Sequence, residues 1–165
     1  MREQGQIEFA ITAVEGRPPP RMKSLLLAEV PLVLLVPKDS PVGTAEELWT
    51  LKRISEPLIS LPADETISRL FQKGLKARKV VWTPSIVASS LDSLVAYVSS
   101  GYGLGVGLAP SAQQARRMGL RVLPLDGFNR LQVMALWQGT PAPALGFLID
   151  QTRHYAENHR RTAGS

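Results

Sequence analysis

The stretch Ser89–Pro110, SSLDSLVAYVSSGYGLGVGLAP, combines the sequence signals of a helix, a stop and a strand. It begins with two serines, either of which suits a helix N-cap, because a serine oxygen accepts an unpaired amide proton of the first turn. Apolar residues then recur at the spacing of one helix face: Leu91, Leu94, Val95 and Val98. Gly101 follows the last of them, where helices commonly close in the left-handed conformation. The pattern predicts a helix that ends just before Gly101.

A strand with one apolar face and one bare face is predicted after this stop. Apolar residues alternate with glycines over 102–108, so that Gly103, Gly105 and Gly107 share one face. A face without side chains admits close approach by another backbone, a helix or a ligand. Tight packing of a helix on the sheet is the favoured interpretation, and a ligand beside Gly105 is the alternative.

Outward from this stretch, short apolar runs alternate with amphipathic segments. The runs predict strands over 7–12, 25–27, 32–36, 58–61, 80–82, 121–123 and 131–137. Further helices are predicted from the Thr44–Glu47 capping box to about Leu51, from Asp64–Glu65 to Leu75, over 111–118, and from Pro143 to about His159. Strands that alternate with helices predict an α/β sandwich with a largely parallel sheet.

The composition is that of a globular chain without thiol chemistry. The 165 residues carry a net charge of +5 and no cysteine, which excludes disulfides and cysteine nucleophiles. Neither an apolar run long enough to span a membrane nor a signal-peptide core is present, so we expect a cytoplasmic protein without a membrane partner. The basic residues are scattered, which favours a solvated surface over a face that contacts DNA directly.

No combination of residues in the sequence predicts catalysis or metal binding. His154 and His159 are five residues apart on a predicted helix and have no third ligand beside them. Asp64 and Glu65 are able to act as an acid/base pair in principle, but adjacent carboxylates at a helix start more often cap the helix and interact with its dipole. We therefore expect no enzyme activity, no cofactor and no metal.

Four sequence blocks, in this order, resemble the effector-binding domain of LysR-type transcriptional regulators. They are Gly5–Ile11 (GQIEFAI), Pro31–Pro41 (PLVLLVPKDSP), Leu91–Pro110, and Leu131–Trp137 with the closing helix after it. The resemblance extends from about Gly5 to about Glu157, although Ser40 replaces the family's usual histidine. It implies an α/β fold of two lobes like a type-II periplasmic binding protein. Lobe II would be complete over 30–137, and lobe I would be partial, over 1–29 and 138–165.

The resemblance begins part-way into the family's domain. The family's winged helix-turn-helix, its linker helix and the first elements of lobe I have no counterpart here. We therefore expect an N-terminally truncated domain, whose intact protein reaches DNA only through the missing helix-turn-helix. A partial lobe I would expose a sheet edge and apolar surface, which predicts a homodimer or higher oligomer. A monomer in light scattering at micromolar concentration would contradict that prediction.

A small-molecule effector is the partner that the resemblance implies, in the cleft between the lobes. Two predicted helix N-termini, at Asp64–Thr66 and Ser89–Ser90, would face that cleft, and their unpaired amides favour a carboxylate-bearing metabolite. The candidate effector-binding residues are Ile11, Thr12, Asp64, Glu65, Thr66, Ser89, Ser90 and Gly105. For Thr12, Ser89 and Ser90, capping and strand-end hydrogen bonding are an equal alternative. The carboxylates at 64–65 argue against a purely anionic ligand; they would bind an amine or polar end, or cap the helix.

Two other functions stay open at the level of sequence. A solute-binding protein of a transporter shares the two-lobe fold and would bind a ligand without affecting a promoter. An enzyme on the same fold would turn over a metabolite, and Asp64→Ala or Glu65→Ala would abolish that turnover. The ordered blocks favour the regulator.

Overall fold

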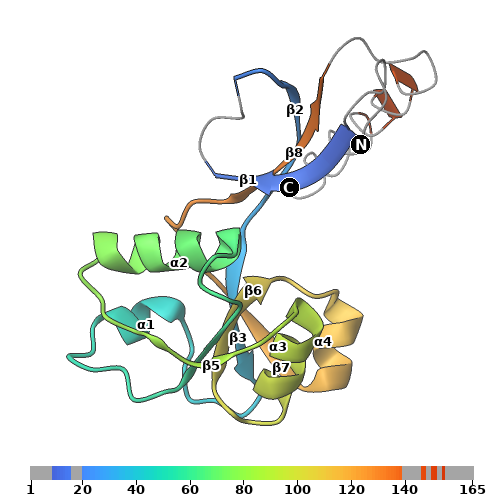
Figure 1. Cartoon of the computed structure of the whole chain (residues 1–165). Coiled ribbons are helices and arrows are strands. Elements are labelled where there is room, and N and C mark those ends of the chain that lie inside the picture. The colour runs from blue at the N-terminus through green and yellow to red at the C-terminus, as the bar shows by residue number, and fades with distance from the viewer. Residues whose placement is uncertain (1–8, 16–19, 139–145, 148–149, 152–153, 155–165) are drawn as a thin grey trace. The chain divides into compact units, whose positions relative to one another are not determined.

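A computed structural model of the chain describes residues 9–15, 20–138, 146–147, 150–151 and 154. The chain forms two compact units, of which the first comprises 1–30 and 131–165 and the second comprises 31–130. Among the described residues, no helix is long and apolar enough to cross a membrane. The predicted α/β fold is confirmed, since helices and strands alternate through the second unit (Figure 1).

The first unit contains a three-stranded antiparallel sheet. Its strands are β1 (Phe9–Val14), β8 (Leu131–Trp137) and β2 (Lys23–Val30), with β8 in the middle. The sequence boundaries placed 131–137 in lobe II, but β8 pairs along its length with β1 and β2 of this unit. Leu27 and Ala135 form its buried centre, with Leu25 and Trp137 packed against them. Of the predicted closing helix (143–159), most residues lie outside the described part of the chain, and those described (146–147, 150–151 and 154) are helical.

The second unit contains a five-stranded mixed sheet with the order β5-β4-β6-β3-β7. The strands are β3 (Leu32–Pro37), β4 (Leu58–Ser60), β5 (Pro84–Val87), β6 (Leu104–Leu108) and β7 (Leu120–Pro124). β4 pairs parallel with β5 and β6, whereas β3 pairs antiparallel with β6 and β7. Four strands therefore point one way, and β3 runs against them between β6 and β7.

The prediction of a largely parallel sheet is wrong for the first unit and for the pairs that β3 makes. Parallel neighbours need a connection that returns across the sheet, usually a helix. The helix after β3 is α1 (Ala45–Trp49), which has only 5 residues. The connection 38–57 that contains α1 does not return across the sheet, since β4 begins at the edge where β3 ends.

The other helices belong to connections that do return across the sheet. They are α2 (Thr66–Ala77) between β4 and β5, α3 (Leu91–Ser99) between β5 and β6, and α4 (Ala112–Met118) between β6 and β7. In Figure 1, α3 and α4 lie on the opposite side of the sheet from α1. The predicted helix and its stop are confirmed: α3 ends at Ser99, and Gly101 follows in the left-handed region with φ of 83°.

The bare face of β6 is covered by α3. A Cβ atom added at Gly105 would lie 2.7 Å from both Leu94 Cδ2 and Val98 Cγ2. Gly107 faces the same helix, because its added Cβ would lie 3.3 Å from Leu91 Cδ2. The close approach that glycine permits is therefore used for packing a helix on the sheet. Apolar side chains fill the space beside Gly105, and its place among the effector contacts stays a prediction.

The apolar run 80–82 was predicted to be a strand, and that prediction is wrong. Val80 N–H donates to Leu75 O at 2.9 Å and so continues the exit of α2, after Lys79 in a left-handed conformation (φ 58°). Trp82 is 4% exposed, and its Nε1–H donates to Glu56 O at 2.8 Å. The strand begins only at Pro84, on the edge strand β5, where a missing amide proton is tolerated.

Four aromatic side chains form the core around α1 and α2. Trp49 lies with its ring centroid 6.4 Å from Phe71, 6.3 Å from Trp82 and 5.9 Å from Phe128. Phe71 and Phe128 stack with centroids 5.6 Å apart. Arg78 closes this cluster: its Cζ lies 4.0 Å above the Phe128 ring, and its guanidinium donates to Gly74 O and Asp126 O. The segment after β7 is thereby fixed to α2.

Candidate functional site

The carboxyl ends of two neighbouring parallel strands, β4 and β5, meet at one edge of the second sheet. Ala88 N–H, just past β5, donates to Ser60 O at the end of β4, at 2.8 Å. α2 begins a few residues beyond β4, and α3 begins a few residues beyond β5. The fold therefore brings the segments Asp64–Thr66 and Ser89–Ser90 to the same edge of this unit. We call this the carboxyl edge.

A buried pair of serines fixes the start of α2 to the end of β4. Ser60 and Ser68 are 1% and 3% exposed, and their Oγ atoms lie 3.1 Å apart. Ser68 Oγ also donates to Leu61 O at 2.8 Å. Buried hydroxyls are stabilising only when they are paired, and this pair is satisfied within the fold. The first turn of α2 is thereby held in one position.

Replacing Ser68 with alanine is expected to lower the free energy of unfolding by about 1–2 kcal/mol, because Ser60 Oγ and Leu61 O both lose a buried partner. Urea denaturation would measure the loss. The double variant Ser60→Ala/Ser68→Ala should lose about 1 kcal/mol less than the sum of the single variants, since the serines interact directly. Additive losses would show that the serines act independently.

The first turn of α2 has no side-chain cap. Glu65 occupies the N-cap position in an extended conformation, but its carboxylate accepts no hydrogen bond from the turn. Asp64 and Glu65 are both exposed. The capping alternative for these carboxylates is therefore absent from the structure. The amides of the turn stay available, with the positive end of the dipole of a 12-residue helix behind them.

Arg69 brings a guanidinium to this uncapped turn. It donates to the backbone oxygen of Asp64 and, at 3.3 Å, to Thr66 Oγ1. A positive side chain beside a helix N-terminus adds to the positive potential of the dipole instead of offsetting it, and such a site favours an anion. Sequence reasoning missed Arg69. Its position three residues after Thr66, on the same helix face, was the available signal.

The start of α3 differs because it is capped. Ser90 Oγ accepts from Ser93 N–H at 3.1 Å and donates to Ser93 Oγ at 3.0 Å. Capping, one of the two alternatives for Ser90, is therefore its role in the structure. Ser89 is exposed, and no side-chain hydrogen bond joins it to another described residue. Its hydroxyl is left for a ligand or water at the carboxyl edge.

The remaining candidates, Ile11 and Thr12, lie in the first unit. They sit within β1, opposite Ala135 and Met134 of β8, and not at the strand's end as predicted. The Ile11 side chain is 55% exposed, and the Thr12 hydroxyl donates to its neighbour Ala13 O at 3.4 Å. Both side chains are therefore accessible on the sheet of their own unit.

The part of the chain that the structure describes contains no candidate metal site of several acidic or histidine side chains. Within it, no group of three or more His, Cys, Asp or Glu side chains is placed to hold a metal ion. The carboxyl edge instead offers backbone amides, hydroxyls and a guanidinium, which are hydrogen-bond donors suited to an anionic ligand.

Residues 1–156 match the family described as "LysR substrate binding domain". Among solved structures, the chain is similar to the effector-binding domain of QuiR in complex with shikimate, with 16% identity and a TM-score of 0.73. That match covers 92% of this chain and 72% of the QuiR chain. No protein of curated function matches the chain.

Two further solved structures have the same fold. The regulatory domain of Synechocystis CcmR in complex with 2-PG is 15% identical with a TM-score of 0.72, covering 91% of this chain and 74% of that one. HinK, a LysR family transcriptional regulator from Pseudomonas aeruginosa, is 14% identical with a TM-score of 0.71, and the match covers 90% of this chain. The chain spans 52% of the length of HinK.

Proposed function

The chain belongs to the LysR substrate-binding domain family, and from that premise we propose that it senses a small carboxylate-bearing metabolite at the carboxyl edge of its second unit. In this proposal the ligand's carboxylate accepts hydrogen bonds from the first-turn amides of α2 and from Arg69. Thr66 and Ser89 supply hydroxyls to the rest of the molecule. Family membership favours a regulatory domain over the transporter and enzyme alternatives.

The uncapped first turn of α2 is the observation that carries this proposal. Helix ends commonly satisfy their free amides with a side chain, as Ser90 does for α3 and Ser111 does for α4. Thr44, predicted to cap α1, makes no such bond, so α1 and α2 are both uncapped, but α1 has only 5 residues and a correspondingly weak dipole. α2 is the longest of these four helices, and neither Asp64 nor Glu65 caps it. An anion at this position would satisfy the free amides and interact favourably with the dipole.

The residues beside the first turn of α2 also indicate which other chemical groups the ligand carries. Asp64 and Glu65 are exposed beside the turn, so a second anionic group on the ligand would be repelled. Hydroxyl or amine groups would instead find acceptors there. Shikimate, which is bound in the similar QuiR domain, combines one carboxylate with several hydroxyls and is a suitable first probe. Ile11 and Thr12 stay candidate contacts on the ground of the family resemblance alone.

Control of transcription is the second part of the proposal. The intact protein would bind DNA through a helix-turn-helix that the four sequence blocks do not include, and effector binding here would change that DNA binding. The +5 net charge does not by itself place a DNA contact on this chain, because the basic residues are scattered.

Thermal melts with paired compounds test the ligand class. Each small carboxylate, shikimate included, is compared with its uncharged amide analogue. We expect at least one carboxylate to raise the melting temperature, since a ligand at a hundred times its Kd stabilises the folded state by about 2.7 kcal/mol. The matching amide should have little effect. An amide that stabilises as well as its carboxylate would contradict an anion site.

A further inference from the structure

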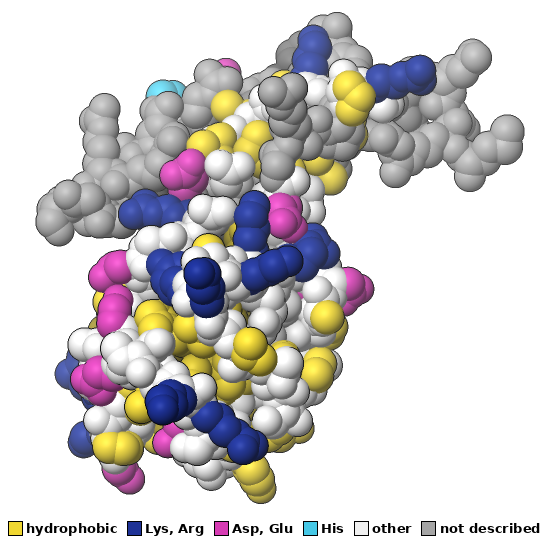
Figure 2. All heavy atoms as spheres, turned by 90° about the vertical axis from the view of Figure 1, so that its left-hand side faces the viewer, with side chains coloured by type: hydrophobic (Ala, Val, Ile, Leu, Met, Phe, Trp, Pro, Cys, Tyr) yellow, Lys and Arg dark blue, Asp and Glu magenta, His cyan; other side chains and the backbone are white. Residues whose placement is uncertain are grey.

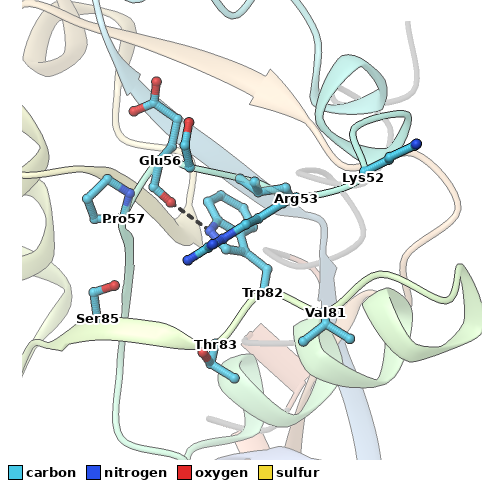
Figure 3. A pocket seen from close by; sticks show the side chains of 10 residues that line it. Lys52, Arg53, Glu56, Pro57, Val81, Trp82, Thr83 and Ser85 are labelled. Atoms are coloured by element: carbon cyan, nitrogen blue, oxygen red, sulfur yellow. Dashed lines mark hydrogen bonds between the residues drawn. The ribbon is translucent and has the colours of Figure 1, made fainter.

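A hollow of about 600 Å³ opens on the second unit, away from the carboxyl edge. It lies where β4 and β5 begin, whereas the carboxyl edge lies where the same strands end. Residues 52–57, which lead into β4, form one wall, and residues 81–83 and 85 at the start of β5 form the other (Figure 3). The volume is within the usual range of small-molecule sites.

The base of the hollow is apolar and firmly held. Trp82 is 4% exposed and is anchored by its Nε1–H bond to Glu56 O on the opposite wall. Pro57 is fixed by Leu104 N–H, which donates to Pro57 O at 2.9 Å. Val81 beside the tryptophan is 85% exposed and adds apolar surface to the hollow. An aromatic or aliphatic ligand body would cover Val81, with the buried indole of Trp82 beneath it.

Positive charge lies at the rim of this hollow. Lys52 and Arg53 line it together with one carboxylate, that of Glu56. In Figure 3 the Arg53 side chain extends across Trp82, whereas Lys52 points away and the Glu56 carboxylate points away from the guanidinium. Arg53 makes no hydrogen bond or ion pair with another described residue. On the face seen in Figure 2, Lys and Arg side chains lie above and below a group of hydrophobic ones, and Asp and Glu side chains lie at its left.

Three hydroxyl groups complete the lining. Ser55, Thr83 and Ser85 are exposed, and their side chains make no hydrogen bond to any other residue that the structure describes. By contrast, Ser60, Ser68 and Ser90 at the carboxyl edge bond within the fold. The hollow thus joins a free guanidinium and free hydroxyls to an apolar base, which is the usual composition of a small-molecule site.

We propose that this hollow is a second ligand site, which takes a small compound with an anionic group on an apolar ring. The anion, a carboxylate or a phosphate ester, pairs with the Arg53 guanidinium, because a planar guanidinium matches both groups with two parallel hydrogen bonds. The ring covers Val81 beside the buried Trp82, and ring substituents meet Thr83 and Ser85. This site is independent of the proposed effector site at the carboxyl edge.

Phenyl phosphate and phenylacetate are the probes, and amide NMR shifts of the whole chain are the readout. Both compounds should move the Trp82 indole signal and the amides of Ser55, Thr83 and Ser85, in a saturable way. Phenol, which lacks the anion, and inorganic phosphate, which lacks the ring, should each bind more weakly. If only one of the two ring compounds binds, the anion class is narrowed to phosphate esters or to carboxylates.

The variant Arg53→Gln should weaken binding by about tenfold or more, the effect of losing a hydrogen bond to a charged group. Lys73→Gln removes the same charge from an exposed residue of α2 that does not line the hollow, and should leave the affinity little changed. Equal losses in the two variants would show only a general charge effect and would overturn the proposal. The proposal would also be overturned if neither phenyl phosphate nor phenylacetate binds, or if the amide NMR shifts appear only at residues 64–69 and 89–90. Shifts at both places would support two separate sites.

Discussion

A Gly74→Ala variant is expected to lose about 3 kcal/mol of unfolding free energy, the upper part of the usual range for overpacking a core. Gly74 lies on the face of α2 that meets Phe128, and an added Cβ atom would overlap that ring. Phe128 cannot move aside easily, because it stacks on Phe71 and lies beneath Arg78. Alanine favours a helix by about 1 kcal/mol over glycine, which is too little to offset the overlap. Urea denaturation would measure the loss.

Two comparisons isolate the cause of that loss. Gly43→Ala is the matched control, because an added Cβ there would meet only the flexible end of the Glu47 side chain. Its stability should change little. Combining Gly74→Ala with Phe128→Leu should recover part of the lost stability, since a smaller side chain leaves room for the methyl group. A Gly74→Ala variant as stable as the parent chain would show that the Phe128 ring does not pack against Gly74.

The variant Arg69→Gln is expected to weaken the binding of a small carboxylate by about tenfold to a hundredfold, the cost of removing one charge-assisted hydrogen bond. The guanidinium lies beside the uncapped turn of α2, through its bonds to Asp64 O and Thr66 Oγ1. Glutamine keeps hydrogen-bonding ability and loses the charge. Calorimetric titration of each variant with the carboxylate that stabilises the parent chain would give the ratio.

Lys73→Gln is the matched control for Arg69→Gln. It removes one positive charge from the same helix, one turn further on, at an exposed residue. The affinity should stay close to that of the parent chain, because surface charges at that distance are largely screened. Equal effects of the two substitutions would mean that overall charge, and not a contact at the first turn, decides the affinity.

The helix α3 and its two ends were predictable because each local sequence signal agrees with the fold. Ser90 caps the helix, Leu94 and Val98 face the sheet, and Gly101 closes the helix. The strand predicted over 80–82 was wrong because these apolar residues make tertiary contacts instead: Val80 ends α2, and Trp82 packs in the aromatic core. Hydrophobic periodicity cannot distinguish a buried strand from a loop with buried side chains in so short a run. The direction of β3 was not predictable either, because the local pattern of 38–57 does not show whether this connection returns across the sheet.

The candidate site was predictable only as far as its helix ends. That two helices begin at neighbouring strand ends followed from the alternation of strands and helices, and the structure places Thr66 and Ser89 at one edge accordingly. Which turn keeps free amides did not follow, because Asp64 has the residue type of a cap but lies outside the N-cap position, and Glu65, which occupies that position, makes no such bond. The covering of Gly105 by α3 was not predictable with certainty, because a bare strand face has the same sequence pattern whether a helix or a ligand covers it. Self-association of the chain stays a prediction.

The central claim is that a small carboxylate binds at the first turn of α2, and an amide NMR titration with shikimate tests it most directly. We expect saturable shifts at Thr66, Ile67 and Ser68, with smaller ones at Ser89, and we expect Arg69→Gln to reduce them. The fold supports this reading because those amides have no side-chain cap. Saturable shifts that leave residues 64–69 unchanged, or no shifts with shikimate and with every other carboxylate of the melting series, would contradict the claim.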